Sequence, residues 1–322
     1  MIEPTFRPTT IDDAELAADL MTAAYPEFGV DPVLTRYRWE HPRKDWTYGS
    51  FIAEMSGKPI AFVHWMHGPP EQDPQRHCEV GVALDQTSLD VELLTHLWLW
   101  ASGQAAAGGS RMLDAYAAED EPEMLEAIAR VGYGRDRLEK VWELDLGLHG
   151  ARLVGEAEQE RAEHERAGYE LTTVARWEAP MKFEALHSLD TLTRKDIPTT
   201  FPILPETFEN FMERLRSPDR PHDRWWVAVR DGKPVAMSYL RFPPVRGRVW
   251  TGYTCCHPDH RGRGIARAVK LQSLAQAVAL SVPYVYTDND SENAPMLHIN
   301  ERLGYGPRPG LIGLLKRVEI ER

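Results

Sequence analysis

The sequence has little of what marks secreted or membrane-bound proteins. Its 322 residues include three cysteines, Cys78, Cys255 and Cys256. A disulfide between the two adjacent cysteines would be strained, so we expect reduced thiols and a cytoplasmic protein. No apolar run approaches the length that crosses a bilayer, and the first residues, MIEPTFRPTT, lack the basic and then apolar pattern of a signal peptide. We therefore expect no membrane partner.

Positive charge is also scarce. Lysine and arginine number 37 against 49 aspartates and glutamates, which gives a formal net charge of -12. Because a protein that binds nucleic acid needs a basic face, we expect no nucleic-acid partner. The acidic surplus is compatible with a cationic ligand, although such a surplus more commonly keeps a protein soluble. A hydrophobic content of 43% at this length is typical of a globular chain with two domains.

The chain repeats itself. The segment GKPIA at 57–61 returns as GKPVA at 232–236, and VGYG at 131–134 returns as LGYG at 303–306. The spacing of the first match also places Gln86 over Arg261. Several matches in the same order at nearly one spacing indicate a duplicated domain, and the period is too long for a solenoid.

Each copy predicts a mixed α/β structure from its hydrophobic periodicity. A charge-rich segment of strong helix formers at 151–167 lies between the copies, and we interpret it as an exposed linker helix. We expect domains at 1–150 and 168–322. The expected strands are 49–55, 59–66, 78–84, 111–116, 225–229, 234–240, 249–256 and 284–287, and the expected helices are 12–24, 90–107, 123–131, 264–280 and 294–303.

The sharpest functional signal is the segment HPDHRGRGIA at 257–266, between a predicted strand and a predicted helix. Gly262 and Gly264 allow consecutive backbone N–H groups to turn toward one point, and the helix dipole adds its positive end. Arg261, Arg263 and Arg267 add positive charge in an acidic protein. A pyrophosphate is the natural ligand of such a loop, whereas a plain glycine turn with scattered arginines is the alternative.

A second segment follows at 287–305. Asn293 suits a helix N-cap, Pro295 suits the first turn, and Gly304 suits the position past the helix end. His257 and His260 lie three residues apart, but no further ligands follow at suitable spacing, so we expect no metal.

Together the two segments resemble the signatures of the GNAT superfamily of acyl-CoA N-acyltransferases, in its tandem, two-domain form. Arg261, Gly264 and Ala266 match the first signature. Asn293, Met296, Asn300, Gly304 and Tyr305 match the second. The resemblance implies two GNAT-like domains, each with a mixed, mostly antiparallel central sheet flanked by helices. It also implies a V-shaped opening between the fourth and fifth strands, in which acetyl-CoA lies.

The resemblance implies an N-acetyltransferase that moves acetyl from acetyl-CoA to a primary amine, on a small molecule or a peptide, by direct attack in a ternary complex. A non-catalytic CoA-binding or sensing module and an O-acyltransferase are the alternatives. We expect a monomer or a homodimer. The expected coenzyme contacts are Cys256, His257, Arg261, Gly262, Arg263, Gly264, Ile265, Ala266, Asn289, Asn293 and Asn300.

Proton transfer is where this sequence departs from the family. Asn300 stands where relatives commonly carry a tyrosine that protonates the departing thiolate, and an amide has no proton to give at neutral pH. We take Asn300 and Tyr253 as catalytic candidates. The sequence does not choose between Tyr253 and four other possible proton carriers, Tyr239, Glu209, His222 and Asp223. An acyl intermediate on Cys255 or Cys256 is conceivable but less favoured than direct transfer.

The first copy departs from the loop pattern. On the spacing of the repeat, Leu89 stands at the place of Gly264, where a side chain would block a phosphate, and Asp90 adds negative charge. We therefore expect a degenerate first copy and one coenzyme site per chain. The bulky residues of its long helix, Trp98 and Trp100 among them, are interpreted as core packing.

Overall fold

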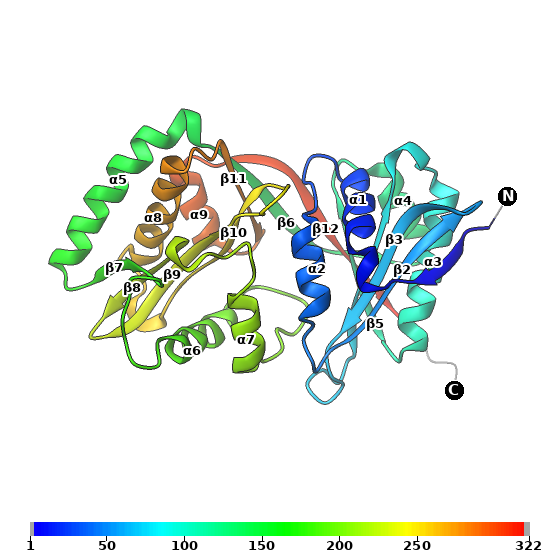
Figure 1. Ribbon diagram of the computed structural model, residues 1–322, viewed down its shortest axis with the longest axis horizontal. Helices are drawn as coiled ribbons and strands as arrows, with labels where there is room; N and C mark the ends of the chain where they lie inside the picture. Colours follow the sequence, from blue (N-terminus) through cyan, green and yellow to red (C-terminus); the bar gives the residue numbers. More distant parts are fainter. Residues whose placement is uncertain (1–2, 319–322) are drawn as a thin grey trace.

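A computed structural model describes residues 3–318. One twelve-stranded sheet runs through the whole molecule, in the order β1-β2-β3-β4-β5-β12-β6-β11-β10-β9-β8-β7. Helices cover the sheet on both sides (Figure 1). Apart from two parallel contacts, β4 with β5 and β10 with β11, neighbouring strands are antiparallel. The expected fold class, α/β with two tandem halves and a mixed sheet, is confirmed.

Each half repeats one order of strands and α-helices. The first half comprises β1 (Thr5–Pro8), η1 (Ile11–Asp13), α1 (Ala14–Ala24), α2 (Pro32–Glu40), β2 (Thr47–Met55), β3 (Lys58–His67), β4 (His77–Leu84), η2 (Gln86–Ser88), α3 (Val91–Ala107), β5 (Met112–Ala118), α4 (Pro122–Arg130) and β6 (Gly134–Asp145). After helix α5 (Leu146–Arg166), the second half comprises β7 (Glu170–Thr173), α6 (Lys182–Arg194), α7 (Phe208–Leu215), η3 (His222–Arg224), β8 (Trp225–Arg230), β9 (Lys233–Arg241), β10 (Val249–Cys256), η4 (Pro258–His260), α8 (Ile265–Ala279), β11 (Tyr284–Asp290), α9 (Ala294–Leu303) and β12 (Gly306–Arg317).

The repeated GKP segments each open the second strand of a hairpin. Ser56 and Gly57 have φ angles of 52° and 75°, and Asp231 and Gly232 have φ angles of 50° and 72°. Two successive residues with positive φ match the twist of the strands that flank a two-residue turn. The predicted hairpins β2–β3 and β8–β9 are confirmed, and the same turn chemistry explains why the repeat is clearest there.

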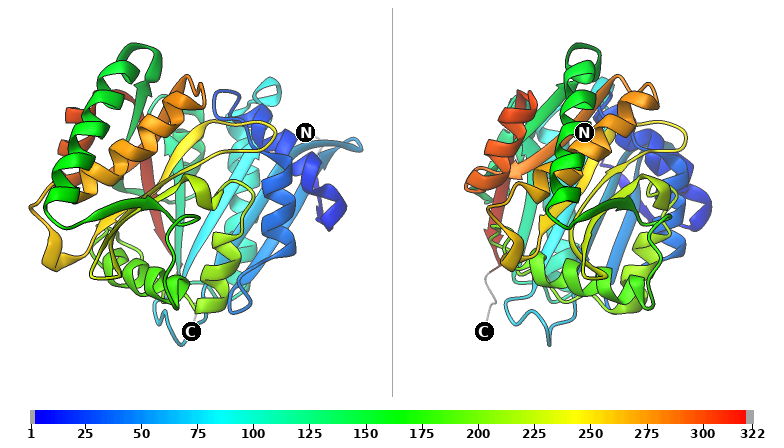
Figure 2. Two further views of the ribbon diagram at one scale, coloured as in Figure 1. Left: turned by 60° about the vertical axis from the view of Figure 1, so that its left-hand side comes forward. Right: turned by 90° about the vertical axis from the view of Figure 1, so that its left-hand side faces the viewer.

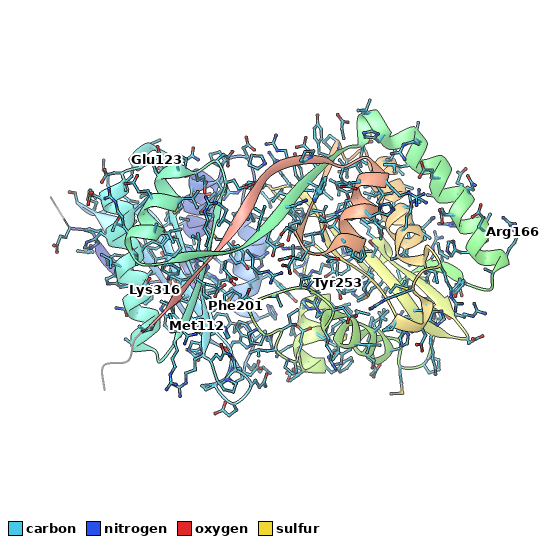
Figure 3. All side chains as sticks on the ribbon, turned by 180° about the vertical axis from the view of Figure 1, so that it is seen from behind. Met112, Glu123, Arg166, Phe201, Tyr253 and Lys316 are labelled. Atoms are coloured by element: carbon cyan, nitrogen blue, oxygen red, sulfur yellow. The ribbon has the colours of Figure 1, made fainter. Side chains whose placement is uncertain are left out.

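The two halves exchange their last strands. Strand β12 of the second half pairs with β5 of the first, and β6 of the first half pairs with β11 of the second. These two long strands also pair with each other where they cross between the halves. Figure 3 shows Lys316 of the second half beside Met112 of the first. Neither half therefore completes its sheet from its own stretch of sequence.

The helix between the halves differs from the exposed linker we expected. It begins at Leu146 rather than at 151, and it packs along α8, as Figure 1 shows. Leu153 and Ala157 are buried within that contact. Gly150 lies so close to α8 that an added Cβ would meet Val278 at 3.1 Å. The apolar stripe of α5 belongs to the core of the second half, and Glu156 and Glu160 beside that stripe form ion pairs with Arg267 of α8.

Helices α3 and α4 cover one face of the sheet in the first half, and α1 covers the other. In the second half, α5, α8 and α9 share one face, and α6 and α7 share the opposite one (Figure 2). Trp98 is fully buried in the first core, as expected. Within residues 3–318, no helix is both long and apolar enough to span a bilayer.

Candidate functional site

The parallel strands β10 and β11 touch at only two residue pairs, Val249 with Val285 and Trp250 with Tyr286, and then separate. Beyond that point the register between β10 and β9 shifts at Gly252. A side chain is excluded there, because a Cβ on Gly252 would lie 2.0 Å from the Tyr239 ring. The expected V-shaped opening between the fourth and fifth strands is therefore present in the second half.

The glycine loop after β10 forms a cradle of backbone donors. Gly262 and Gly264 have φ angles of 73° and 78°, in the left-handed region that glycine adopts without strain. Within the described residues, the backbone N–H groups of 262–266 have no hydrogen-bond acceptor. Gly264 is the N-cap of α8 and provides no capping side chain. Five free donors at the positive end of a fifteen-residue helix make an anion site suited to a pyrophosphate.

The arginines of this loop are less available than the sequence suggested. Arg261 forms an ion pair with Asp196 and donates to the carbonyl of Cys256 at 3.1 Å. Arg267 forms ion pairs with two glutamates of α5. Arg263 contacts the Tyr169 hydroxyl at 3.3 Å and has no carboxylate partner among residues 3–318. The backbone cradle and Arg263, rather than all three arginines, therefore supply the positive potential.

Helix α5 supports the loop from behind. The two ring nitrogens of His164 lie 2.8 Å from the carbonyl oxygen of Glu160 and 3.1 Å from that of Arg263. The Tyr169 hydroxyl lies 3.1 Å from Nδ1 of His260. The segment that joins the halves thus fixes the carbonyl at the centre of the glycine loop, a role that its sequence did not reveal.

The corresponding loop of the first half is built differently. Between β4 and α3 it is two residues shorter, and by turn and cap position Asp90, not Leu89, takes the place of Gly264. The prediction that placed Leu89 at the position of Gly264, which assumed one constant spacing between the repeats, was therefore wrong. The Asp90 carboxylate accepts the Leu93 backbone N–H at 2.9 Å, so the chain's own anion caps α3. Leu89 is extended and exposed. An external phosphate would meet a carboxylate at this helix end.

The second predicted segment begins α9 as expected. The Asn293 side chain accepts the Met296 N–H at 3.4 Å, and Gly304 ends the helix with a φ of 94°. Asn300 is completely buried. Its amide donates to Asn289 at 2.6 Å and accepts from the Lys270 ammonium at 2.7 Å. Both groups of the amide therefore have partners inside the protein, which favours a positioning role for Asn300 over direct contact with sulfur.

Lys270 is the unusual member of this network. The side chain is fully buried, and its Nζ lies 4.9 Å from the centre of the Tyr305 ring. Burial lowers the pKa of Lys270 to about 7, and the charge of Asp288 offsets this only in part. The lysine was not singled out from the sequence, because its position in an amphipathic helix resembles a solvent-facing one.

The other residues that the sequence offered as proton carriers or nucleophiles do not form one cluster. Tyr253 donates to the Thr193 hydroxyl at 3.1 Å, and burial raises its pKa. Burial also raises the pKa of Cys255 to about 12 and that of Cys256 to about 11. Both thiols are therefore protonated at neutral pH, which argues against an acyl-cysteine. Tyr239 packs on Trp225 in the core, Glu209 pairs with Lys44, and His222 contacts the carbonyl of Leu215. The structure does not bring these three and Asp223 together around the opening.

Sequence reasoning missed one acid at the site. Asp288 of β11 accepts a hydrogen bond from Nε1 of Trp250 at 2.7 Å, next to the point where β10 and β11 separate. Its side chain is open to solvent, yet the surrounding protein desolvates it enough to raise its pKa. The only signal was the polar run at 287–293, which indicated a turn rather than a strand. His257 and His260 face each other, but no group of three or more possible metal ligands occurs among residues 3–318.

Comparisons with known proteins agree with this architecture. Residues 186–305 match the model of the Acetyltransferase (GNAT) family. A comparison with curated proteins by sequence gives no match. The fold is similar to that of a tandem GNAT protein from the clavulanic acid biosynthesis pathway, with a TM-score of 0.76, 18% identity, and coverage of 99% of this chain and 100% of that one.

A second similar structure is a GCN5-related N-acetyltransferase from Sphaerobacter thermophilus, with a TM-score of 0.67, 17% identity, and coverage of 99% and 98%. A third is a GNAT-family acetyltransferase from Colwellia psychrerythraea, with a TM-score of 0.60, 12% identity, and coverage of 98% and 100%. At these identities the likeness concerns the fold. The chain therefore has the tandem GNAT fold, and its second half carries a domain of the acetyltransferase (GNAT) family.

Proposed function

We propose that the protein transfers an acyl group, acetyl in the first instance, from its coenzyme A thioester to a primary amine by direct attack. The observation that carries the proposal is the cradle of five free backbone N–H groups at 262–266, next to the opening between β10 and β11. Acetyl-CoA supplies an activated acyl group. The chain's part is to hold both reactants close together, which can provide much of the acceleration.

The loop residues fit a coenzyme of this kind. Gly262 has nothing within 4 Å of the position of a Cβ, so a phosphate can approach its backbone closely. Arg263 can add charge from the side. Residues 256–266 and Asn293 at the start of α9 flank the opening, while Asn289 and Asn300 hold α9 against β11 from within.

Asp288 is the base that the geometry favours. A primary amine is protonated at neutral pH and must lose a proton before it attacks. The carboxylate lies beside Trp250, at the start of the opening, and its raised pKa brings it closer to neutrality than a free aspartate. The indole N–H fixes the orientation of one carboxylate oxygen, which leaves the other for the amine.

Both halves contribute to the acceptor side. Phe28 of the first half lies 6.0 Å from the Trp250 ring, and the Tyr37 hydroxyl donates to the carbonyl of Glu213 at 2.8 Å. The loop between α6 and α7 reaches the first half, where the Phe201 ring meets His77 at 5.0 Å (Figure 3). We propose that the degenerate first half is retained to shape this cleft.

Release of thiol from acetyl-CoA, measured over a panel of amines, amino acids, peptides and aminoglycosides, tests the function. We expect turnover with at least one amine, and its loss in Gly264→Leu, because leucine is strained at a φ of 78° and fills the cradle. Binding of acetyl-CoA without turnover on any acceptor would favour a CoA-binding module. Turnover on alcohols alone would favour O-acyl transfer.

A further inference from the structure

A small pocket between the halves carries an excess of positive charge. Its volume is about 200 Å³. The first half lines it with α2 and the loop before α2, and the second half lines it with β9, β10 and the loop between them. Four arginines take part: Arg38, Arg241, Arg246 and Arg248. The pocket is smaller than those that enclose a whole drug-sized ligand, so it suits one end of a molecule.

Three of the four arginines already have carboxylate partners. Arg241 pairs with Asp219 at 2.6 Å, and Arg246 pairs with Asp19 at 2.6 Å. Arg248 lies 3.6 Å from Glu27 and 3.9 Å from Glu143. These pairs balance their charges and hold the walls of the pocket in place.

Arg38 is the exception. Within residues 3–318 it has neither an ion pair nor a side-chain hydrogen bond. Desolvation, with Arg241 as the next cause, lowers its pKa to about 10, so the guanidinium stays charged at neutral pH. Arg38 is exposed on the wall of the pocket, so its unpaired guanidinium is accessible to the anionic group of a ligand that enters.

The nearby acids are not available to Arg38. Asp31 accepts the Leu34 N–H at 3.0 Å with one oxygen and the Val245 N–H at 2.6 Å with the other. Asp219 is held by Arg241 and by the Ser217 hydroxyl. Both carboxylates therefore already have partners in the folded chain, whereas Arg38 has no carboxylate partner among residues 3–318.

The pocket adjoins the proposed reaction centre. Trp250 lines it, and the indole nitrogen of the same residue donates to Asp288. A ligand that places an anionic group beside Arg38 can therefore extend past one indole ring toward the carboxylate that we propose as the base. Such a ligand would place an anionic end beside the Arg38 guanidinium and an ammonium end beside the Asp288 carboxylate.

We propose that the acceptor is an amine that also bears an anionic group, a carboxylate or a phosphate, and that Arg38 binds that group. This inference rests on the proposed function and specifies its substrate class. Arginine favours both anions because its planar fork donates two parallel hydrogen bonds.

Three short acceptors test the inference: β-alanine, 2-aminoethyl phosphate and propylamine. We expect a KM at least about tenfold lower for one of the anionic amines than for propylamine, and the better one identifies the anion. Arg38→Leu should raise the KM of that acceptor by about 10- to 100-fold and leave propylamine unchanged. Arg38→Lys, which keeps the charge without the fork, should fall between them.

Arg36→Leu is the matched control, because Arg36 lies on the same helix but pairs with Glu40 at 3.8 Å on the surface. This variant should leave the KM of all three acceptors unchanged. Equal KM changes for all acceptors in Arg38→Leu, or no change in any, would overturn the inference. Calorimetric titration of propionate and inorganic phosphate into the chain without coenzyme tests the anion site at Arg38 independently of the proposed acyl transfer. Binding of either anion that Arg38→Leu abolishes would support the subsite even if no acyl transfer occurred, and failure of both to bind would contradict it.

Discussion

The indole nitrogen of Trp250 donates a hydrogen bond to a carboxylate oxygen of Asp288 across 2.7 Å, from one strand to the next. Trp250 is the last residue of β10 that pairs with β11 before the strands separate. The bond therefore marks the point where the opening between β10 and β11 meets the pocket between the halves. It holds Asp288 in a fixed orientation at the candidate reaction centre. Nothing in the sequence indicated that this aspartate belongs to the site.

Replacing Asp288 with asparagine should lower kcat/KM by about 100- to 10,000-fold, the range typical of a lost general base. In the wild type, kcat/KM should rise with pH along a single ionisation, because the carboxylate becomes a base only when pH passes its raised pKa. Asp288→Asn should remove that limb of the profile. A sharply bell-shaped wild-type profile would contradict the account.

Replacing Trp250 with phenylalanine provides a milder test of the same pair. The ring stays, but the hydrogen bond to the carboxylate is lost, so we expect a fall in kcat of about tenfold. Affinity for acetyl-CoA, measured by calorimetry, should stay unchanged. Loss of coenzyme affinity with kcat retained would show that the indole serves the coenzyme instead.

The exchanged strands predict how the chain can be divided. A fragment of residues 168–322 lacks β6, which pairs with both β11 and β12, and also lacks α5, which supports the glycine loop. We expect it to aggregate or to bind acetyl-CoA weakly. A fragment that begins at residue 134 restores both elements and should be the more soluble of the two. A fully active 168–322 fragment would leave the role of the first half without support.

Residues with local signals could be predicted from the sequence. The hairpins at 56–57 and 231–232, the glycine loop and the Asn293 cap all follow from short-range chemistry, and the structure confirms them. Strands β6 and β12 escaped prediction. Charged residues crowd the start of β6, prolines and glycines crowd the start of β12, and their partners lie in the opposite half.

The candidate site divides in the same way. The cradle at 262–266 could be located from the sequence because it depends on a backbone conformation with positive φ angles, which glycine adopts without strain. Asp288, Lys270 and Arg38 could not, because each owes its properties to neighbours that are distant in the chain, and Lys270 also to its complete burial. A uniform repeat spacing also hid the two-residue difference between the loops, which only the turns and caps of both halves reveal.

Lys270 predicts an unusual dependence of stability on pH. Its pKa is near 7 in the folded chain and 10.5 when unfolded, so between these values the unfolded state binds more protons and stability rises with pH. Lys270→Met removes this penalty. By chemical denaturation, the variant should gain on the order of 1 kcal/mol or more over the wild type at pH 6, and the gain should shrink toward pH 10. An equal difference at all pH values would contradict a buried, titrating lysine.

Asn300→Ala should act through the same network. It leaves the Lys270 and Asn289 side chains without their partner, so we expect a loss of about 1–3 kcal/mol in the free energy of unfolding and a moderate loss of turnover. The double variant Lys270→Met with Asn300→Leu replaces both members of the buried pair and should recover most of the stability. Complete loss of turnover in Asn300→Ala, with stability and coenzyme affinity intact, would instead show that Asn300 is catalytic.

Calorimetric titration of acetyl-CoA into the full chain tests the central claim most directly. The free donors at 262–266 and the Asp90 carboxylate that caps α3 predict a stoichiometry near one. Gly264→Leu should abolish binding, and Leu89→Ala, at the exposed loop of the first half, should leave it unchanged. A stoichiometry of two, or full binding in Gly264→Leu, would contradict a single coenzyme site on the glycine loop of the second half.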